Sequence, residues 1–277
     1  MSENSTQPHI QKCRLVLLPC VCCFVNMEGM KNSLYFLMLV LLTAFFTGCG
    51  SGHEKIEIKG DAQAVRMAQT MMDTLGGLQR WAKIKSVYIR TFNYESAKDE
   101  NYVLEEWLDL DRPRVYNRQV KDGTFEIKIL DGNDGWVIHG GKIDLLPSSS
   151  ITNLLDWHEH FLMTVLKDLA IGGENCELKL NGQNRFDLYR NGKFLGGFEL
   201  NENNYPVRYF EVLSRSLNVS MIITRWGEYK GYKYPLEIHP QLVLAIYKTD
   251  YWNPSEEEAD KAFNISFDPN IALQKMQ

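Results

Sequence analysis

The sequence has almost no cysteine in the part of the chain that can fold. Only Cys176 of its six cysteines lies beyond residue 49. The other five are Cys13, Cys20, Cys22, Cys23 and Cys49. A disulfide framework needs pairs within the folded region, so a small disulfide-stapled domain is excluded. Cys176 is expected to be a small buried side chain, because Glu174 and Glu177 beside it do not provide the positive charge that activates a thiol.

The sequence also has no excess of positively charged residues. The chain carries 30 lysines and arginines against 35 aspartates and glutamates, a formal net charge of −5. Binding to nucleic acid depends on a basic field that neutralises phosphates, so this composition predicts no nucleic-acid partner. Proline-rich linkers, low-complexity tracts and internal repeats are absent from Asp61 to Pro269, which favours a single domain.

Several common catalytic patterns are missing as well. There is no Gly-x-Ser-x-Gly nucleophile elbow, and Gly76-Gly77 follows a helical pattern, whereas a phosphate-binding loop precedes a helix. Glu105 and Glu106 point to opposite faces of a predicted strand. His158 and His160 lie about 200° apart on a helix, so they cannot share a metal. The sequence therefore predicts no catalytic residue, no metal ligand and no cofactor, and we expect a protein that is not an enzyme.

What the sequence does contain begins with a short apolar segment. Met30-Lys31-Asn32-Ser33 is followed by an apolar run from Leu34 to Phe46. This run of about 13 residues spans roughly 20 Å as a helix, which is too short for the ~30 Å core of a bilayer but typical of a signal peptide. Small residues before a cysteine, Thr47-Gly48-Cys49, make the segment resemble a bacterial lipoprotein signal with Cys49 as the lipidated residue.

This interpretation divides the chain into four parts. Residues 1–29 are interpreted as an over-extended start, 30–48 as a lipoprotein signal peptide, 49–60 as a flexible tether and 61–277 as a single domain. Lipid on Cys49 would make the membrane a lasting partner, because each buried CH₂ contributes about 0.8 kcal/mol.

Two segments have the spacing of amphipathic helices. In the first, apolar residues recur every three or four positions after a candidate cap at Asp61, and Gly76-Gly77 ends or breaks the helix. The second begins at a cap formed by Ser149 or Ser150, has one wide apolar face, and stops at Gly172-Gly173. We expect these two principal helices to cover one side of a sheet.

Most of the remaining chain is predicted to be strand and turn. Phe125, Ile127 and Ile129 alternate with Glu126 and Lys128, which gives one dry and one wet face. Turn dipeptides recur at roughly 8 to 12 residue intervals, as in a meander of hairpins. They are Asp122-Gly123, Asp131-Gly132, Gly140-Gly141, Asn181-Gly182 and Asn191-Gly192. The pattern predicts an α+β protein that is mainly β, with an antiparallel sheet.

The sequence is rich in large apolar side chains. One interpretation is a plain packed core. The other is that the sheet and its covering helices leave an apolar cavity, in which aromatic and methionine side chains suit ligands of variable shape. The candidate cavity-lining residues are Trp107, Phe125, Ile127, Trp136, Leu154, Trp157, Phe161 and Val165.

Five segments, in order, resemble one family. Gly76 to Val87 resembles the helix-to-first-strand junction of the bacterial LolA/LolB-like lipoprotein carriers and the sorting-protein-like superfamily around them. Asp111 to Arg118 and Leu130 to Trp136 resemble hairpins between its early strands. Tyr229 to Pro235 and Phe263 to Pro269 are similar to its last strands. The resemblance covers most of the chain after Cys49.

The resemblance implies an open half-barrel, a single strongly curved antiparallel sheet with the helices across its concave face, which holds acyl chains without covalent chemistry. LolB-like members are outer-membrane lipoproteins of Gram-negative bacteria, which agrees with Cys49 and implies a lipid-anchored protein at the outer membrane facing the periplasm. The chain departs from the family in its length and in a long insertion from Tyr247 to Ala262.

We therefore expect a lipidated envelope protein that binds or transfers a lipid or lipoprotein acyl group in an apolar cavity. An alternative is a membrane-anchored structural or interaction module with a packed core and no ligand. A third hypothesis is a hydrolase of unrecognised type.

Lipidation is tested by Cys49→Ala. The variant is expected to remain a full-length precursor that takes up no labelled palmitate, because the thiol is the acceptor of the lipid. Metabolic labelling of both proteins in a bacterial host measures this, and equal labelling of the variant would contradict the prediction.

Overall fold

The computed structural model describes residues 58–173, 175–214, 217–241, 245–254 and 266–275. All of them belong to one compact unit, Glu54–Gln277. The predicted signal peptide and Cys49 lie outside the described residues. No helix in the described part of the chain is long and apolar enough to span a bilayer.

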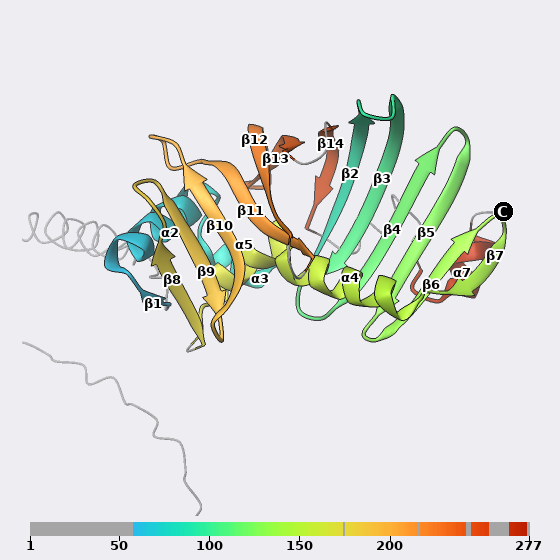
Figure 1. Ribbon diagram of the computed structural model, residues 1–277, viewed down its shortest axis with the longest axis horizontal. Coiled ribbons are helices and arrows are strands. Elements are labelled where there is room, and N and C mark those ends of the chain that lie inside the picture. The colour runs from blue at the N-terminus through green and yellow to red at the C-terminus, as the bar shows by residue number, and fades with distance from the viewer. Residues whose placement is uncertain (1–57, 174, 215–216, 242–244, 255–265, 276–277) are drawn as a thin grey trace, which may run out of the picture. The chain divides into compact units, whose positions relative to one another are not determined.

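The strands form one sheet of 14 members (Figure 1). Six consecutive neighbours are β2 (Ser86–Glu95), β3 (Glu100–Asp109), β4 (Arg114–Lys121), β5 (Thr124–Asp131), β6 (Asp134–His139) and β7 (Lys142–Leu145). Seven more are β8 (Cys176–Leu180), β9 (Arg185–Arg190), β10 (Lys193–Leu200), β11 (Pro206–Ser214), β12 (Leu217–Tyr229), β13 (Tyr232–Pro240) and β14 (Ala245–Asn253). A short first strand, β1 (Lys59–Gly60), pairs in parallel with β8.

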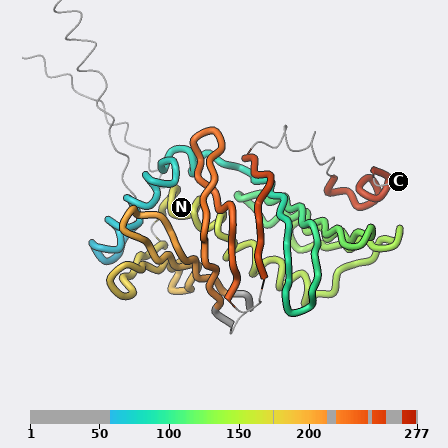
Figure 2. Tube along the Cα trace, turned by 90° about the horizontal axis from the view of Figure 1, so that it is seen from above, coloured from blue at the N-terminus to red at the C-terminus, as the bar shows by residue number. Residues whose placement is uncertain are grey.

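Every pair of neighbouring strands apart from β1 and β8 is antiparallel. The two runs join where β14 pairs with β2, and Figure 2 shows these two strands side by side. The sheet order begins at β1 and ends at β7, so the sheet is not closed into a barrel. These observations confirm the predicted fold class, a mainly β protein with a single curved, open antiparallel sheet.

The turn dipeptides join strands where they were predicted. Asp122-Gly123 connects β4 to β5, and Asn191-Gly192 connects β9 to β10. Both residues of each loop have positive φ, 50° and 75° in the first and 51° and 75° in the second. Such pairs form the two-residue hairpin loops whose twist matches that of antiparallel strands, and aspartate, asparagine and glycine tolerate this conformation best.

The described helices number five. They are α2 (Ala62–Thr74), α3 (Leu78–Lys83), α4 (Ser148–His160), α5 (Leu162–Ile171) and α7 (Pro269–Gln274). The predicted break at Gly76-Gly77 is confirmed, since it separates α2 from α3 with φ values of 117° and 92°. A Cβ on Gly76 would lie 2.3 Å from the carbonyl oxygen of Gly231, so the chain can pass the β12–β13 turn only without a side chain there.

Two details of the helix predictions need correction. Asp61 occupies the N-cap of α2, but its carboxylate accepts a hydrogen bond from the backbone N–H of Leu180 at 2.8 Å and caps no helical N–H. The second predicted helix is two helices, because Phe161 between them is extended with φ −65° and ψ 135°. The first of them, α4, starts at Ser148, directly after Pro147, whereas the sequence predicted a cap at Ser149 or Ser150.

The main core lies between the helices and one face of the sheet. Helix α2 packs on β8 and β9, α5 packs on β10, and α3 packs on α5. Trp81, Leu166 and Phe186 are fully buried members of this core. The indole Nε1 of Trp81 donates to the Leu75 carbonyl at 3.0 Å, which satisfies its buried polar group. Cys176 is buried and unpaired with another cysteine, as the sequence analysis expects.

A second, smaller core lies on the opposite face of β2–β6. Trp107, Tyr116 and Ile129 are its buried centre, and α7 covers it through Ala272. Phe267, just before α7, packs edge-on against Trp107 with ring centroids 4.7 Å apart. The sheet is therefore covered on both faces, by α2–α5 on what we call the helix face and by α7 on the outer face.

Three segment predictions are also corrected. Lys59–Gly60, expected in the flexible tether, form β1 with Ile58 buried before it. The segment from Tyr247, expected to be an insertion, continues the sheet as strand β14 to Asn253, and residues 255–262 of it lie outside the described residues. The predicted last strand, Phe263 to Pro269, is described only from Ser266, and there the chain enters α7 without a strand.

Replacement of Leu166 by alanine is expected to lower the free energy of unfolding by about 2 to 5 kcal/mol, because its side chain is fully buried in the main core. Ile171→Ala, on the same helix but 56% exposed, is the matched control and should change it by less than about 1 kcal/mol. Urea unfolding measures both, and similar losses in the two variants would contradict this packing.

Candidate functional site

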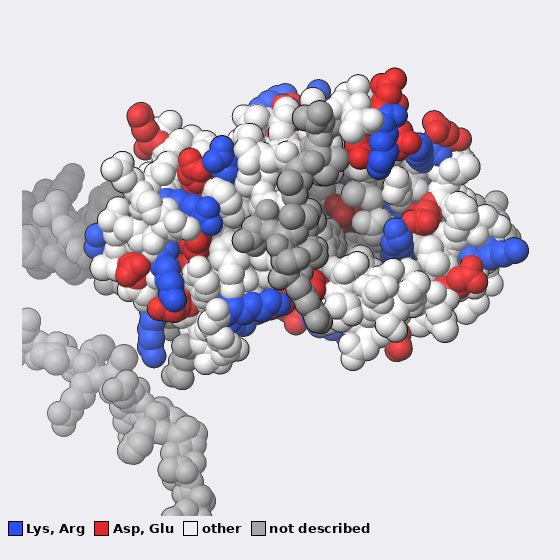
Figure 3. Space-filling model, viewed as in Figure 1, with Lys and Arg blue, Asp and Glu red and all other residues white. Residues whose placement is uncertain are grey.

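A cavity of about 410 Å³ lies between α4 and the helix face of the sheet. Its helical wall is formed by Leu154, Trp157, Phe161, Leu162 and Met163. The remaining wall comes from strands β2–β5 on one side and β11–β14 on the other. Figure 3 shows the molecule hollowed above α4, in front of β2–β4, with charged side chains inside the hollow.

The cavity exists because α4 is only partly packed into the core. Seven of the ten residues of α5 are buried, whereas α4 buries only His158 and His160. Because Phe161 is extended, α4 does not continue the line of α5. Leu154 and Trp157 are therefore half-buried at the edge of a space instead of being enclosed in a core.

Three of the predicted lining residues, Leu154, Trp157 and Phe161, line this cavity. The rings of Trp157 and Phe161 are in contact, with centroids 4.9 Å apart. Val165 is fully buried in the main core and does not reach the cavity.

The other four predicted lining residues, Trp107, Phe125, Ile127 and Trp136, belong to the outer-face core. The physical reason is the period of two along a strand, because residues one position apart point to opposite faces. The dry alternation of β5 was correctly identified but assigned to the wrong side of the sheet. The residues of β3, β4 and β5 that face the cavity include four polar ones, Glu106, Asn117, Gln119 and Lys128.

Glu106 is one of two buried carboxyl groups in the cavity wall. Its side chain is on β3, 9% exposed, and its Oε1 accepts a hydrogen bond from Asn117 Nδ2 at 3.2 Å. Burial raises its pKa from the usual 4.5 to about 7, although the Asn117 bond favours the ionised form. Glu105, one residue earlier, lies on the outer face and pairs with Arg118 at 2.7 Å.

Glu211 on β11 is the second buried carboxyl group, only 3% exposed. Its Oε1 has no hydrogen-bond partner among the described residues. Burial, together with the charge of Glu106, raises the pKa of Glu211 to about 8. The two carboxyl groups resist ionisation because each loses hydration on burial, and the charge of Glu106 further opposes that of Glu211.

Apart from Thr91, Asn93 and Thr249, the rest of the cavity wall is apolar or aromatic. Tyr209 is almost completely buried and donates its hydroxyl to the His160 carbonyl at 2.5 Å, and burial raises its pKa well above the usual value. Tyr102 and Tyr247 are hydrogen-bonded to each other, and burial raises the pKa of both. These hydroxyl groups stay neutral at physiological pH and present ring surface to the cavity.

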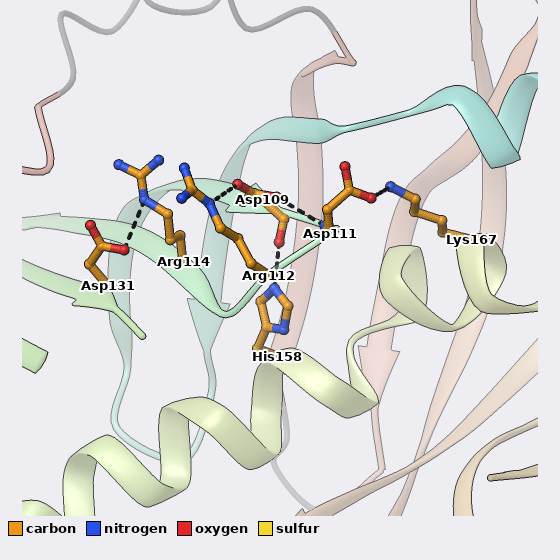
Figure 4. Close-up of polar contacts among 7 residues, drawn as sticks. All are labelled: Asp109, Asp111, Arg112, Arg114, Asp131, His158 and Lys167. Atoms are coloured by element: carbon orange, nitrogen blue, oxygen red, sulfur yellow. Dashed lines mark hydrogen bonds and ion pairs between the residues drawn. The ribbon is translucent and has the colours of Figure 1, made fainter. Parts of the chain in front are cut away.

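Polar contacts hold α4 and α5 against the hairpin between β3 and β4 (Figure 4). His158 Nε2 lies 2.5 Å from the Asp109 carbonyl oxygen, and burial lowers the pKa of this imidazole. The ammonium of Lys167, on a side chain 3% exposed, is paired with Asp111. The Asp109 carboxylate accepts from Arg112 Nε at 2.8 Å, which orders the turn that receives both contacts.

Both histidines of α4 are buried. His160 Nδ1 donates to the Leu195 carbonyl oxygen at 2.8 Å, far along the chain from the Asp109 contact of His158. The two rings bond to different strands. No group of three histidine, cysteine or acidic side chains in the described part of the chain could hold a metal ion.

No protein-family model matches the chain, and no curated protein matches it. A solved structure to which it is similar is a DUF1329 family protein from Desulfovibrio piger ATCC 29098. The sequence identity is 12% and the TM-score 0.38, with 69% of this chain and 91% of that chain covered. A likeness at this level assigns neither a family nor a function.

The two buried acids predict that the protein becomes less stable as the pH rises. In the folded state Glu106 and Glu211 keep protons to about pH 7 and about pH 8, whereas in the unfolded chain they ionise near 4.5. The folded state binds more protons in this window, so the free energy of unfolding falls with pH, by up to about 1.4 kcal/mol per pH unit for each group.

Glu211→Gln is expected to make this dependence shallower, because the amide does not titrate. Urea unfolding between about pH 5 and about pH 8 measures the slope, a range chosen to lie between the unfolded and folded pKa values. Glu202→Gln, in an exposed turn, is the control and should keep the wild-type slope. An unchanged slope in Glu211→Gln would show that Glu211 does not titrate in this range.

Proposed function

We propose that the protein binds a lipid or lipoprotein acyl chain in the cavity beneath α4, as a lipid-anchored carrier or receptor of the cell envelope. The observation that supports the proposal is the unfilled space of about 410 Å³ lined by Leu104, Trp157, Phe161 and Met163. This volume lies in the range of small-molecule sites, about 300 to 1,000 Å³. Apolar and aromatic walls bury hydrocarbon favourably, by about 25 cal/mol per Å² removed from water.

The helical wall provides a route by which a chain could enter. Helix α4 is half-exposed and is joined to the buried α5 through the extended Phe161. Segments with few buried apolar contacts open at lower free energy than core helices. We expect α4 to move while α5 stays fixed, with the Trp157–Phe161 pair at the point of entry.

A membrane anchor at Cys49 completes the proposal. It would keep the cavity within reach of bilayer lipids, at the outer membrane facing the periplasm. The resemblance to the LolA/LolB-like carriers favours the same role. The alternative, an anchored interaction module with a filled core, fits the cavity less well, because a packed core leaves few voids larger than a water molecule.

Leu104→Trp tests the proposal by filling the cavity. It is expected to weaken the binding of a fluorescently labelled long-chain alcohol by about tenfold, a loss of about 1.4 kcal/mol. Val103→Trp is the matched control, because Val103 is the preceding residue of β3 and lines a different pocket, of about 450 Å³, and not the cavity. Fluorescence titration of the purified protein measures both affinities. Absence of binding, or equal loss in the two variants, would contradict the proposal.

A further inference from the structure

The cavity wall has hydrogen-bond acceptors that nothing in the described chain satisfies. Glu211 Oε1 is one, and Asn93 Oδ1, on a side chain 3% exposed, is a second on a different strand. Trp252 Nε1 is the one buried donor without a partner among the lining residues. A buried acceptor left unpaired costs about 1 to 3 kcal/mol, so the cavity favours an occupant that brings donors.

The cavity also lacks a cation to balance its two acids. Lys128 is the only basic residue among the described residues that line it, and its Nζ lies 2.8 Å from Glu126 Oε1 with the side chain 41% exposed. Glu106 has an amide as its hydrogen-bond partner, and no cation among the described residues acts on the charge of Glu211. When both carboxyl groups ionise, the inner wall therefore carries uncompensated negative charge.

The remaining wall suits the same kind of occupant. Six aromatic side chains line the cavity, and they are Tyr102, Trp157, Phe161, Tyr209, Tyr247 and Trp252. The faces of aromatic rings attract cations, most strongly where water is excluded. A cationic group can thus contact carboxylates and rings at once, while an attached alkyl chain occupies the apolar part.

We propose that the polar end of the bound molecule is a protonated primary amine, placed between Glu106 and Glu211 with its alkyl chain along the α4 wall. This inference rests on the proposed function, because it assigns the chemical class of the ligand for the same cavity. Once the two acids are ionised, they would repel a carboxylate or phosphate head. A quaternary ammonium head would keep the charge but leave Asn93 Oδ1 and Glu211 Oε1 without N–H donors.

The binding should depend on pH in a defined direction. The titratable and charged side chains that face the cavity are Tyr102, Glu106, Lys128, Tyr209, Glu211 and Tyr247. Helices α4 and α5 contribute only apolar side chains to the lining. An ammonium stabilises the ionised form of Glu106 and Glu211 and lowers their pKa values, so its binding releases protons and becomes tighter as the pH rises towards about 9.

The test compares four ligands that share one alkyl chain: dodecylamine, dodecanol, dodecanoate and dodecyltrimethylammonium. Calorimetric titration of the purified protein at about pH 6 and about pH 9, on either side of the raised pKa values, measures affinity. Repetition in two buffers with different ionisation enthalpies measures the protons released. At the higher pH we expect the amine to bind about tenfold more tightly than the alcohol for each unit by which it lowers an acid pKa. The trimethyl analogue should bind more weakly than the amine, and dodecanoate more weakly than the alcohol.

Glu211→Gln should remove most of the preference for amine over alcohol, together with most of the proton release, while dodecanol still binds. Glu106→Gln should act in the same direction, and the exposed Glu202→Gln should leave all affinities unchanged. One outcome is that dodecanol binds, that Leu104→Trp weakens this binding, and that the amine is not preferred. It would overturn this inference and leave the proposed function intact. Equal binding of the trimethyl analogue would also overturn it, and absence of binding by all four ligands would overturn both proposals.

Discussion

Side chains alternate between the two faces of a strand, and the composition of the cavity depends on which alternate set faces the helices. In β3–β5 the large apolar set, with Trp107 and Ile129 at its centre, packs beneath α7 and Phe267 on the outer face. The same backbone must then present the other set, Glu106, Asn117 and Lys128, to the helix face. A shift of these strands by one residue would exchange the two sets, so that large apolar side chains would fill the space where the cavity lies.

The helices can leave this space open because two polar contacts hold them at one end of it. Lys167 of α5 and His158 of α4 are both buried and reach the β3–β4 hairpin, at Asp111 and at the Asp109 carbonyl. A buried ammonium without its partner would be strongly unfavourable, so this contact determines where α5 sits against the sheet. Beyond the hairpin α4 diverges from the core at Phe161, and the space beneath it is bounded by side chains from both halves of the sheet.

Much of the fold could be predicted from the sequence because its signals are local. Turn pairs such as Asn191-Gly192 require positive φ, and Gly76-Gly77 interrupts a helical pattern whatever lies around it. Which face of a strand points to the helices and which points to the outer side cannot be read from the local sequence. Alternation in β5 shows that two faces exist, but only the placement of α7 makes the Ile127 face the outer one. The break at Phe161 was missed for a similar reason, since the apolar spacing continues through it.

The two buried acids of the proposed site could not be identified from the sequence, also for physical reasons. Glu211 lies between Phe210 and Val212 in a strand, where a glutamate is normally the solvated member of the alternation. It is buried because β11 pairs with β12 and because α4 packs over β11. Both are contacts between residues far apart in the sequence. Leu154, Trp157 and Phe161 were found because apolar residues on a helix that borders the core have few other places to lie.

The central claim is that the cavity beneath α4 holds an amphiphilic molecule when the protein is in its own environment. The most direct measurement is organic extraction of the protein after purification without detergent exchange, followed by mass spectrometry of the extract. The account predicts about one long-chain molecule per protein chain in the extract of the Cys49→Ala protein, where any covalent lipid is absent, and its loss when Leu104→Trp is added. An extract free of such molecules, or one unchanged by filling the cavity, would contradict it.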